Sequence, residues 1–288
     1  ELLSPITEAN PREDEAFYSK MKLSDLPRLY EEHFGDASQL AGCLVGDISE
    51  AEAKRIVTTY LAALPGNPKA PRRSYTLRDH SSRERVIERT FEVDTEGDLG
   101  EVELSFLGDK KLSERERLAL GLLEPLLQNR LFDELREKEQ GTYSIAVKTS
   151  YTDEPLASSS LSIHFVTSRA KADHLKARTY EILRSIAAGK IDRDEYKKVH
   201  IPQVLDEEAE EKAAGNELGL GDWIALLNAY AETGKAPDLS KKAPGQEVKV
   251  SAVTAQDLSA LLKKLLDEGK RRDIVVKSIA PEAKTWEH

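Results

Sequence analysis

The sequence predicts an α+β fold in which helices pack on one face of an antiparallel-rich sheet, and it predicts that this unit is repeated in the parent protein. Three observations lead there. Strand-like and helix-like segments come in separate groups along the chain, and one helix–strand pattern occurs twice. Of the 288 residues, 39% are hydrophobic and 33% are charged, a balance typical of a packed core under a charged surface.

The repeated pattern places Asp25-Leu26 and Asp257-Leu258 in equivalent positions, 232 residues apart (257 − 25). Each copy begins with a helix that has an apolar stripe and continues through a polar turn into a short hydrophobic strand. We expect these strands at Leu40–Val45 and at Asp273–Val276. A duplicated unit explains both copies.

The duplication predicts how the chain is divided. Residues 1–65 are expected to be the C-terminal tail of a preceding α+β unit, residues 66–75 a linker, and residues 76–288 a complete unit. The linker follows from a basic run with three prolines at Leu64–Arg73. Because the chain begins at Glu1 without Met or a signal peptide, we expect a fragment whose compartment is unknown; cytoplasm and bacterial periplasm are both compatible.

The complete unit is expected to open with two strands, Val86–Val93 and Glu101–Leu107, joined by a Glu-Gly-Asp turn. Ser113 and Glu116 have the spacing of a capping box, which predicts the start of a long helix with a leucine stripe. Gly141 is the expected stop of that helix.

A strand pair is expected next, over Tyr143–Thr149 and Ser158–Val166, because apolar and polar residues alternate in both. In the first of these strands Tyr143, Ile145 and Val147 form the alternating apolar set. Helices are then expected over residues 171–188, ended by Gly189, and over residues 192–214 and 222–232. The second copy of the repeated pattern closes the unit.

Composition excludes several classes of function. A net charge of −10 argues against nucleic acid or anionic membrane as a partner, and no apolar run approaches the length of a membrane span. One Cys excludes a disulfide framework. None of the six His has a second His at the spacing of a helical zinc motif. We therefore predict no metal site and no cofactor-binding residues in this chain.

One corner of the predicted fold brings two donors together. Arg136 ends an amphipathic helix, Gly141 marks a turn, and Tyr143 begins a strand, so a guanidinium and a phenol flank one helix-to-strand corner. Ordinary structural roles are the simpler interpretation of this spacing alone. An Arg near a helix C-terminus interacts favourably with the helix dipole, and Tyr is common at the start of a half-buried strand.

The segment from Arg130 to Tyr143, with Leu-Phe-x-x-Leu-Arg-Glu in it, resembles the signature helix and strand in the C-terminal half of pitrilysin-type zinc metallopeptidases, the inverzincin family. The resemblance covers essentially the whole chain. It includes a Thr/Ser-x-x-Asp-Leu helix followed by a hydrophobic strand, which closes each unit, at Lys22–Val45 and at Thr254–Val276. It also includes an acidic helix that leads into a Tyr-Leu-x-x-Leu-Pro sequence at Tyr60–Pro65.

The resemblance implies a pitrilysin-type fold, in which four such units form two halves around a chamber. It implies that Arg136 and Tyr143 are catalytic residues, which contact the substrate carbonyl and the developing oxyanion. Zinc is implied in the parent enzyme's N-terminal half or in a partner subunit, so this chain alone is expected to be inactive. The implied partners are that zinc-bearing half and a peptide or unfolded polypeptide substrate. A non-catalytic structural or partner-binding subunit of the same fold is the alternative.

Overall fold

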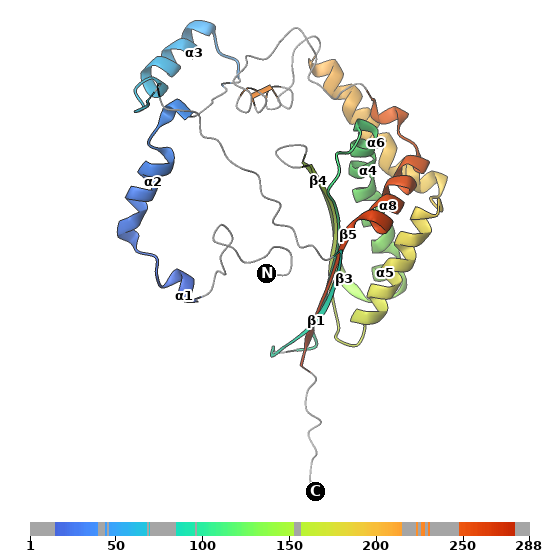
Figure 1. The fold of residues 1–288 in the computed structure, drawn as a ribbon. Coiled ribbons are helices and arrows are strands. Elements are labelled where there is room, and N and C mark those ends of the chain that lie inside the picture. The colour runs from blue at the N-terminus through green and yellow to red at the C-terminus, as the bar shows by residue number, and fades with distance from the viewer. Residues whose placement is uncertain are drawn as a thin grey trace. The chain divides into compact units, whose positions relative to one another are not determined.

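The chain forms two compact units in a computed structural model (Figure 1), the first mainly residues 3–80 and 209–246 and the second mainly residues 81–208 and 247–288. The structure describes residues 15–39, 44, 46–67, 69, 85–95, 97–152, 157–214, 223, 226–227, 230 and 248–279.

The first unit is helical over its described residues. Its elements are α1 (Glu15–Tyr18), η1 (Leu23–Asp25), α2 (Leu26–Phe34), η2 (Ala37–Gln39), α3 (Glu50–Ile56) and η3 (Val57–Leu61). Asp36, just after α2, accepts a hydrogen bond from the backbone N–H of Asn67 at 2.9 Å. Apart from Leu44, the strand predicted at Leu40–Val45 lies outside the described residues, as does most of the helix predicted over residues 222–232.

The second unit contains a five-stranded sheet in the order β1-β5-β2-β4-β3. Its strands are β1 (Val86–Val93), β2 (Gly100–Gly108), β3 (Thr142–Thr152), β4 (Ser158–Thr167) and β5 (Lys270–Ser278). Of the four strand pairs, only β1 with β5 is parallel. The predicted α+β class, the antiparallel-rich sheet and the pairing of β3 with β4 are therefore confirmed.

The two strands that open the second unit are consecutive in the sequence but do not pair with each other. β5 lies between them: Val275 is opposite Thr90 of β1 and opposite Val102 of β2. Val275 is only 2% exposed. The central position also buries two charged residues of this strand, Arg272 and Asp273, which are each 1% exposed.

Helices cover one face of this sheet (Figure 1). They are α4 (Glu114–Leu131), α5 (Ala172–Ala187), α6 (Arg193–Ala214) and α8 (Ala255–Glu268). The helix-facing side chains of β2 and β4 alternate with outward ones and are at most 1% exposed: Val102, Leu104, Phe106, Leu161, Ile163 and Phe165. The leucines of α4 and α8 pack on them, so the core lies between the sheet and its helices.

Local signals fix the helix ends. Ser113 and Glu116 form the predicted capping box at the start of α4, and Thr254 and Asp257 form a second one at the start of α8. Each box satisfies backbone N–H groups that a helix start leaves without an intrahelical partner. Gly189 ends α5 with a φ of 84°, a left-handed conformation that glycine adopts without a steric penalty.

Candidate functional site

The helix that carries Arg136 changes its winding before it ends. α4 continues into a π-helix, η4 (Phe132–Lys138), in which hydrogen bonds span five residues; the N–H of Glu139, for example, donates to the carbonyl of Glu134 at 3.1 Å. Leu135 is completely buried and anchors this turn in the core. π-Helical turns are rare and are frequently found at functional sites, although this chain has a second one at η3.

The turn after η4 differs from the prediction that Gly141 would be the helix stop. The left-handed residue is Gln140, with a φ of 47°. Gly141 has a different role, because a Cβ at this position would lie 2.7 Å from both methyl carbons of Leu175. Its N–H also donates to the carbonyl of Leu135 at 2.9 Å. Glycine here lets the corner approach α5 closely.

Gly141→Ala tests this close approach. Leu175 is fully buried, so it has little room to move away from an added methyl group. We expect the substitution to lower the free energy of unfolding by about 1–3 kcal/mol, the usual cost of overpacking. Urea titration measures the change. Gly121→Ala is the matched control, since nothing lies within 4 Å of a Cβ there; an equal loss in both variants would contradict the packing argument.

The expected inward alternation of Tyr143 with Ile145 and Val147 is wrong. Tyr143 is 91% exposed, whereas Ile145 and Val147 are 7% and 2% exposed. The cause is a β-bulge. Thr142 is opposite Thr167 and Ile145 is opposite Phe165, so β3 has one residue more than β4 in this interval. Bulges redirect side chains in this way, and this one turns the phenol of Tyr143 into solvent.

Arg136 lies on η4 with 43% of its side chain exposed. Its guanidinium carbon is 4.6 Å from the centroid of the Phe132 ring, a cation–π contact. Its Nε is 3.7 Å from the carboxylate of Glu137, which is too long for a hydrogen bond. In the described part of the chain no hydrogen bond joins Arg136 to Tyr143. Because its side chain is 43% exposed and makes no hydrogen bond within the described residues, its donors can reach a ligand.

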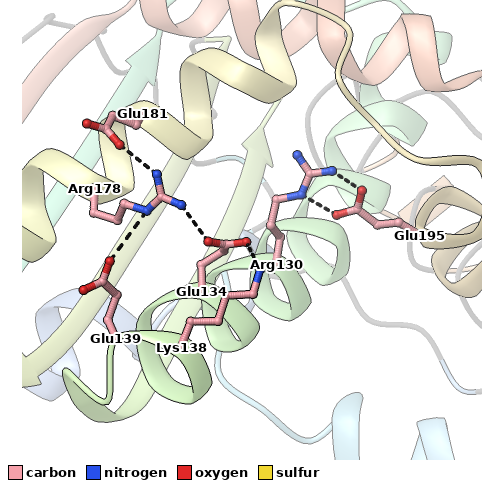
Figure 2. Close-up of polar contacts among 7 residues, drawn as sticks. All are labelled: Arg130, Glu134, Lys138, Glu139, Arg178, Glu181 and Glu195. Carbon is pink, nitrogen blue, oxygen red and sulfur yellow. Dashed lines mark hydrogen bonds and ion pairs between the residues drawn. The ribbon is translucent and has the colours of Figure 1, made fainter.

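A group of ion pairs links η4 to α5 (Figure 2). Arg178, on α5, donates to Glu134 at 2.7 Å and to Glu181 at 2.8 Å, and its Nε lies 3.9 Å from Glu139. Lys138 donates to the second oxygen of Glu134 at 2.6 Å. We call Glu134, Lys138, Glu139 and Arg178 the η4 clamp. None of these clamp contacts involves Arg136, so the clamp ties η4 to α5 without engaging that guanidinium.

A second ion pair fixes the end of α4. Arg130 donates from Nε to Glu195 of α6 at 2.6 Å and from Nη1 to the carbonyl of Lys190 at 2.9 Å. The two side chains of the pair are 18% and 19% exposed, and the paired groups are visible in Figure 2. The segment before the corner is thus attached to both α5 and α6. Sequence reasoning missed Arg178 and Glu195 as partners, because only the spacing of Arg130, Glu134 and Lys138 is visible in the sequence.

The η4 clamp makes stability depend on pH. The hydrogen bond from Lys138, followed by that from Arg178, holds the pKa of Glu134 below its ordinary value against the opposing effect of burial. A carboxyl whose pKa is lower in the folded state stabilises the fold above its unfolded pKa, and this contribution is lost as the pH falls through the folded pKa.

We expect Glu134→Gln to lower the free energy of unfolding by about 1 kcal/mol at pH 7, with the difference from the parent chain shrinking progressively as the pH falls below about 4. Urea titrations at a series of pH values measure this. A difference that stays constant from pH 7 to pH 3 would show that the charge of Glu134 is not the stabilising feature.

The described residues offer no resident metal chemistry. They contain no group of three or more His, Cys, Asp or Glu side chains that could hold a metal ion, so the residues present do not fit a zinc centre. Among the same residues no helix is long and apolar enough to cross a membrane. The chemistry that the corner itself offers is hydrogen-bond donation from a guanidinium and a phenol.

The profile of the peptidase M16 inactive domain matches residues 20–200 of the chain. None of the curated proteins matches this chain. Many solved structures have a similar fold, including the following three. The ferredoxin protease FusC, solved as a mutant in complex with Arabidopsis ferredoxin, aligns with a TM-score of 0.67 and 14% identity over 93% of this chain and 28% of its own.

A peptidase M16 inactive domain from Pseudomonas fluorescens aligns with a TM-score of 0.62 and 18% identity over 93% of this chain and 60% of its own. Pitrilysin aligns with a TM-score of 0.51 and 13% identity over 83% of this chain and 24% of its own. This chain therefore spans less than two thirds of each of these structures.

The matched fold and profile define an α+β domain of the peptidase class. The chain belongs to the peptidase M16 inactive-domain family, and the resemblance to the C-terminal, zinc-free half of pitrilysin-type peptidases is confirmed.

Proposed function

We propose that this chain is the C-terminal half of a zinc-dependent peptidase, that it closes a substrate chamber, and that Arg136 and Tyr143 hold the peptide bond that is cut. The observation that carries the proposal is the local backbone geometry of the corner that holds Arg136 and Tyr143. A π-helix carries Arg136, a bulge turns Tyr143 into solvent, and the surrounding residues are fixed by the η4 clamp. Local irregularities that expose two donors favour a ligand-binding role over a purely structural one.

The proposed roles follow from the chemistry of the two side chains. A guanidinium and a phenol both donate hydrogen bonds to a carbonyl oxygen. Negative charge develops on this oxygen when a peptide bond is attacked, and fixed donors stabilise that charge more than they stabilise the uncharged substrate. Zinc would polarise the carbonyl and activate water in the zinc-bearing half or partner subunit. Arg136 and Tyr143 would bind and orient the peptide from this side.

The exposed apolar side of α2 supports a larger parent protein. The equivalent helices α2 and α8 differ in burial: Leu258 and Leu262 of α8 are fully buried, whereas Leu26 and Tyr30 of α2 are 56% and 66% exposed. In the second unit α8 packs against α4, α5 and β2. We propose that residues 1–65 are the tail of a preceding α+β unit, which covers the apolar side of α2 in the same way, and that residues 66–75 link it to the unit of residues 76–288.

A polypeptide is the proposed substrate class. The solved complex of the ferredoxin protease with ferredoxin is an example of a protein ligand on a relative with this fold. In this chain, the donors of the corner suit a backbone carbonyl, which every peptide presents, so they favour recognition of the main chain over recognition of one side chain.

The test is reconstitution. The purified chain is assayed for cleavage of a quenched-fluorescence peptide alone, with the zinc-bearing half of its parent protein, and with that half treated with a chelator. We expect cleavage only in the second mixture. No cleavage in any mixture, with the two halves bound to each other, would favour the alternative of a non-catalytic structural or partner-binding subunit.

A further inference from the structure

The free edge of the sheet at β3 is covered by two side chains of α4. Gln128 donates from its side-chain nitrogen to the carbonyl of Ile145 at 2.8 Å and accepts from the N–H of Val147 at 2.9 Å. Glu124, one turn earlier, accepts from the N–H of Thr149 at 2.8 Å and from its hydroxyl at 2.9 Å. Three alternate residues of an edge strand thus have backbone groups that are hydrogen-bonded to side chains of a helix.

The pattern of these bonds is that of a neighbouring strand. In a parallel pair, one residue donates its N–H to the carbonyl before its partner residue and accepts from the N–H after it. The side-chain amide of Gln128 does this around Ala146, since it bonds Ile145 on one side and Val147 on the other. The orientation of the amide follows from its partners, because a carbonyl requires a donor and an N–H requires an acceptor.

Glu124 takes the place of the next acceptor that a neighbouring parallel strand would provide. A real parallel strand would next accept from the N–H of Thr149, and the carboxylate of Glu124 takes that place. The residues at 124 and 128 are four apart and so lie on one side of α4. One helix therefore presents a donor and two acceptors at the spacing of a sixth strand.

We propose that Gln128 and Glu124 close the β3 edge against strand addition, so that β3 does not pair with the β3 of a second copy of this chain. Unpaired edge strands are templates for association, and proteins protect them with charges, bulges or covering elements. β3 needs such protection because it is 11 residues long and begins in an exposed corner. The bulge at Tyr143 protects its first residues, and the α4 side chains protect the next ones.

The closed edge has a consequence for the corner, which rests on the proposed function. Extended peptides commonly bind by adding a strand to a free edge. Here the carbonyl of Ile145 and the N–H groups of Val147 and Thr149, which follow the bulge, already have partners. A peptide at the corner would therefore meet the side chains of Arg136 and Tyr143 and would not continue along β3.

Hydrogen exchange measured residue by residue by NMR tests the cover directly and needs no peptidase activity. In the purified chain, the amides of Val147 and Thr149 should exchange slowly although β3 is an edge strand. Gln128→Met, which keeps the stem of the side chain, should speed the exchange of Val147 by about tenfold or more and leave Thr149 protected. Glu124→Gln should keep Thr149 protected because its amide oxygen still accepts. Fast exchange of both amides in the parent chain would overturn the proposal.

Self-association tests what the cover prevents. The Gln128→Met, Glu124→Leu double variant is expected to form dimers in sedimentation experiments and to bind a synthetic peptide with the β3 sequence Thr142–Thr152, whereas the parent chain does neither. Asn129→Ala is the matched control, since it removes an exposed amide from the same helix. A folded double variant with rapidly exchanging Val147 and Thr149 that stays monomeric and does not bind the peptide would contradict the proposal.

Discussion

Arg136→Ala and Tyr143→Phe are each expected to lower kcat/KM of the assembled peptidase by about 100- to 1,000-fold, the usual cost of removing one donor from developing oxyanion charge. Arg136 makes no hydrogen bond within the described part of the chain, and Arg136→Ala removes only its cation–π contact with Phe132, so the free energy of unfolding should fall by at most about 1 kcal/mol. The Tyr143 side chain is 91% exposed, and Tyr143→Phe should leave the free energy of unfolding unchanged. The main loss should therefore appear in activity.

Two further variants distinguish a catalytic role from nonspecific electrostatic attraction of the substrate. Lys148→Ala removes an exposed positive charge from the same strand and should leave kcat/KM within about twofold of the parent value. The Arg136→Ala, Tyr143→Phe double variant should lose less than the product of the two single losses, because residues that act on one group are not additive. Strictly multiplicative losses would indicate two separate roles.

Asp273→Asn is expected to lower the free energy of unfolding by about 3 kcal/mol, because it removes one partner of a buried ion pair. Asp273 lies on β5 with 1% of its surface exposed and is 3.1 Å from the Lys176 amine. The Tyr180 hydroxyl donates to its other oxygen at 2.5 Å. Burial, followed by the hydrogen bond to Asp273, raises the pKa of Tyr180, so the phenol keeps its proton and remains a donor.

The same two elements supply a control for this prediction. Lys277 of β5 donates to Asp173 of α5 at 2.6 Å, but Asp173 is 73% exposed. Asp173→Asn should cost at most about 1 kcal/mol, as is usual for an exposed pair. Urea unfolding of both variants measures the difference. Equal losses would mean that burial does not determine the contribution of Asp273.

The parts of the fold that follow from local patterns were predictable from the sequence. The capping box at Ser113, the leucine stripe of α4 and the alternation in β4 each reflect contacts between near neighbours in the chain. The position of β5 between β1 and β2 depends on which strand gains most from burial, a property of the assembled sheet. No local pattern reports it.

The candidate corner was located from the sequence, but its geometry was not. Periodicity assigned Tyr143 to the inward side of β3, because a strict alternation takes no account of the extra residue in the bulge. Gln140 adopts the left-handed conformation expected of Gly141, since glycine is needed one residue later against Leu175. Arg178 of α5, which pairs with Glu134, and Glu195 of α6, which pairs with Arg130, lie more than forty residues away in the chain from their partners.

The central claim is that the exposed side of this corner touches the substrate. Site-specific photo-crosslinking tests it most directly: a benzophenone amino acid replaces Tyr143 in the assembled protein, and a labelled peptide substrate is added before illumination. We predict cross-links at position 143 to the residues that flank the cleaved bond, and none at the exposed position 148 of the same strand. Absence of cross-links at position 143, or equal cross-linking at both positions, would contradict the proposed role of Arg136 and Tyr143.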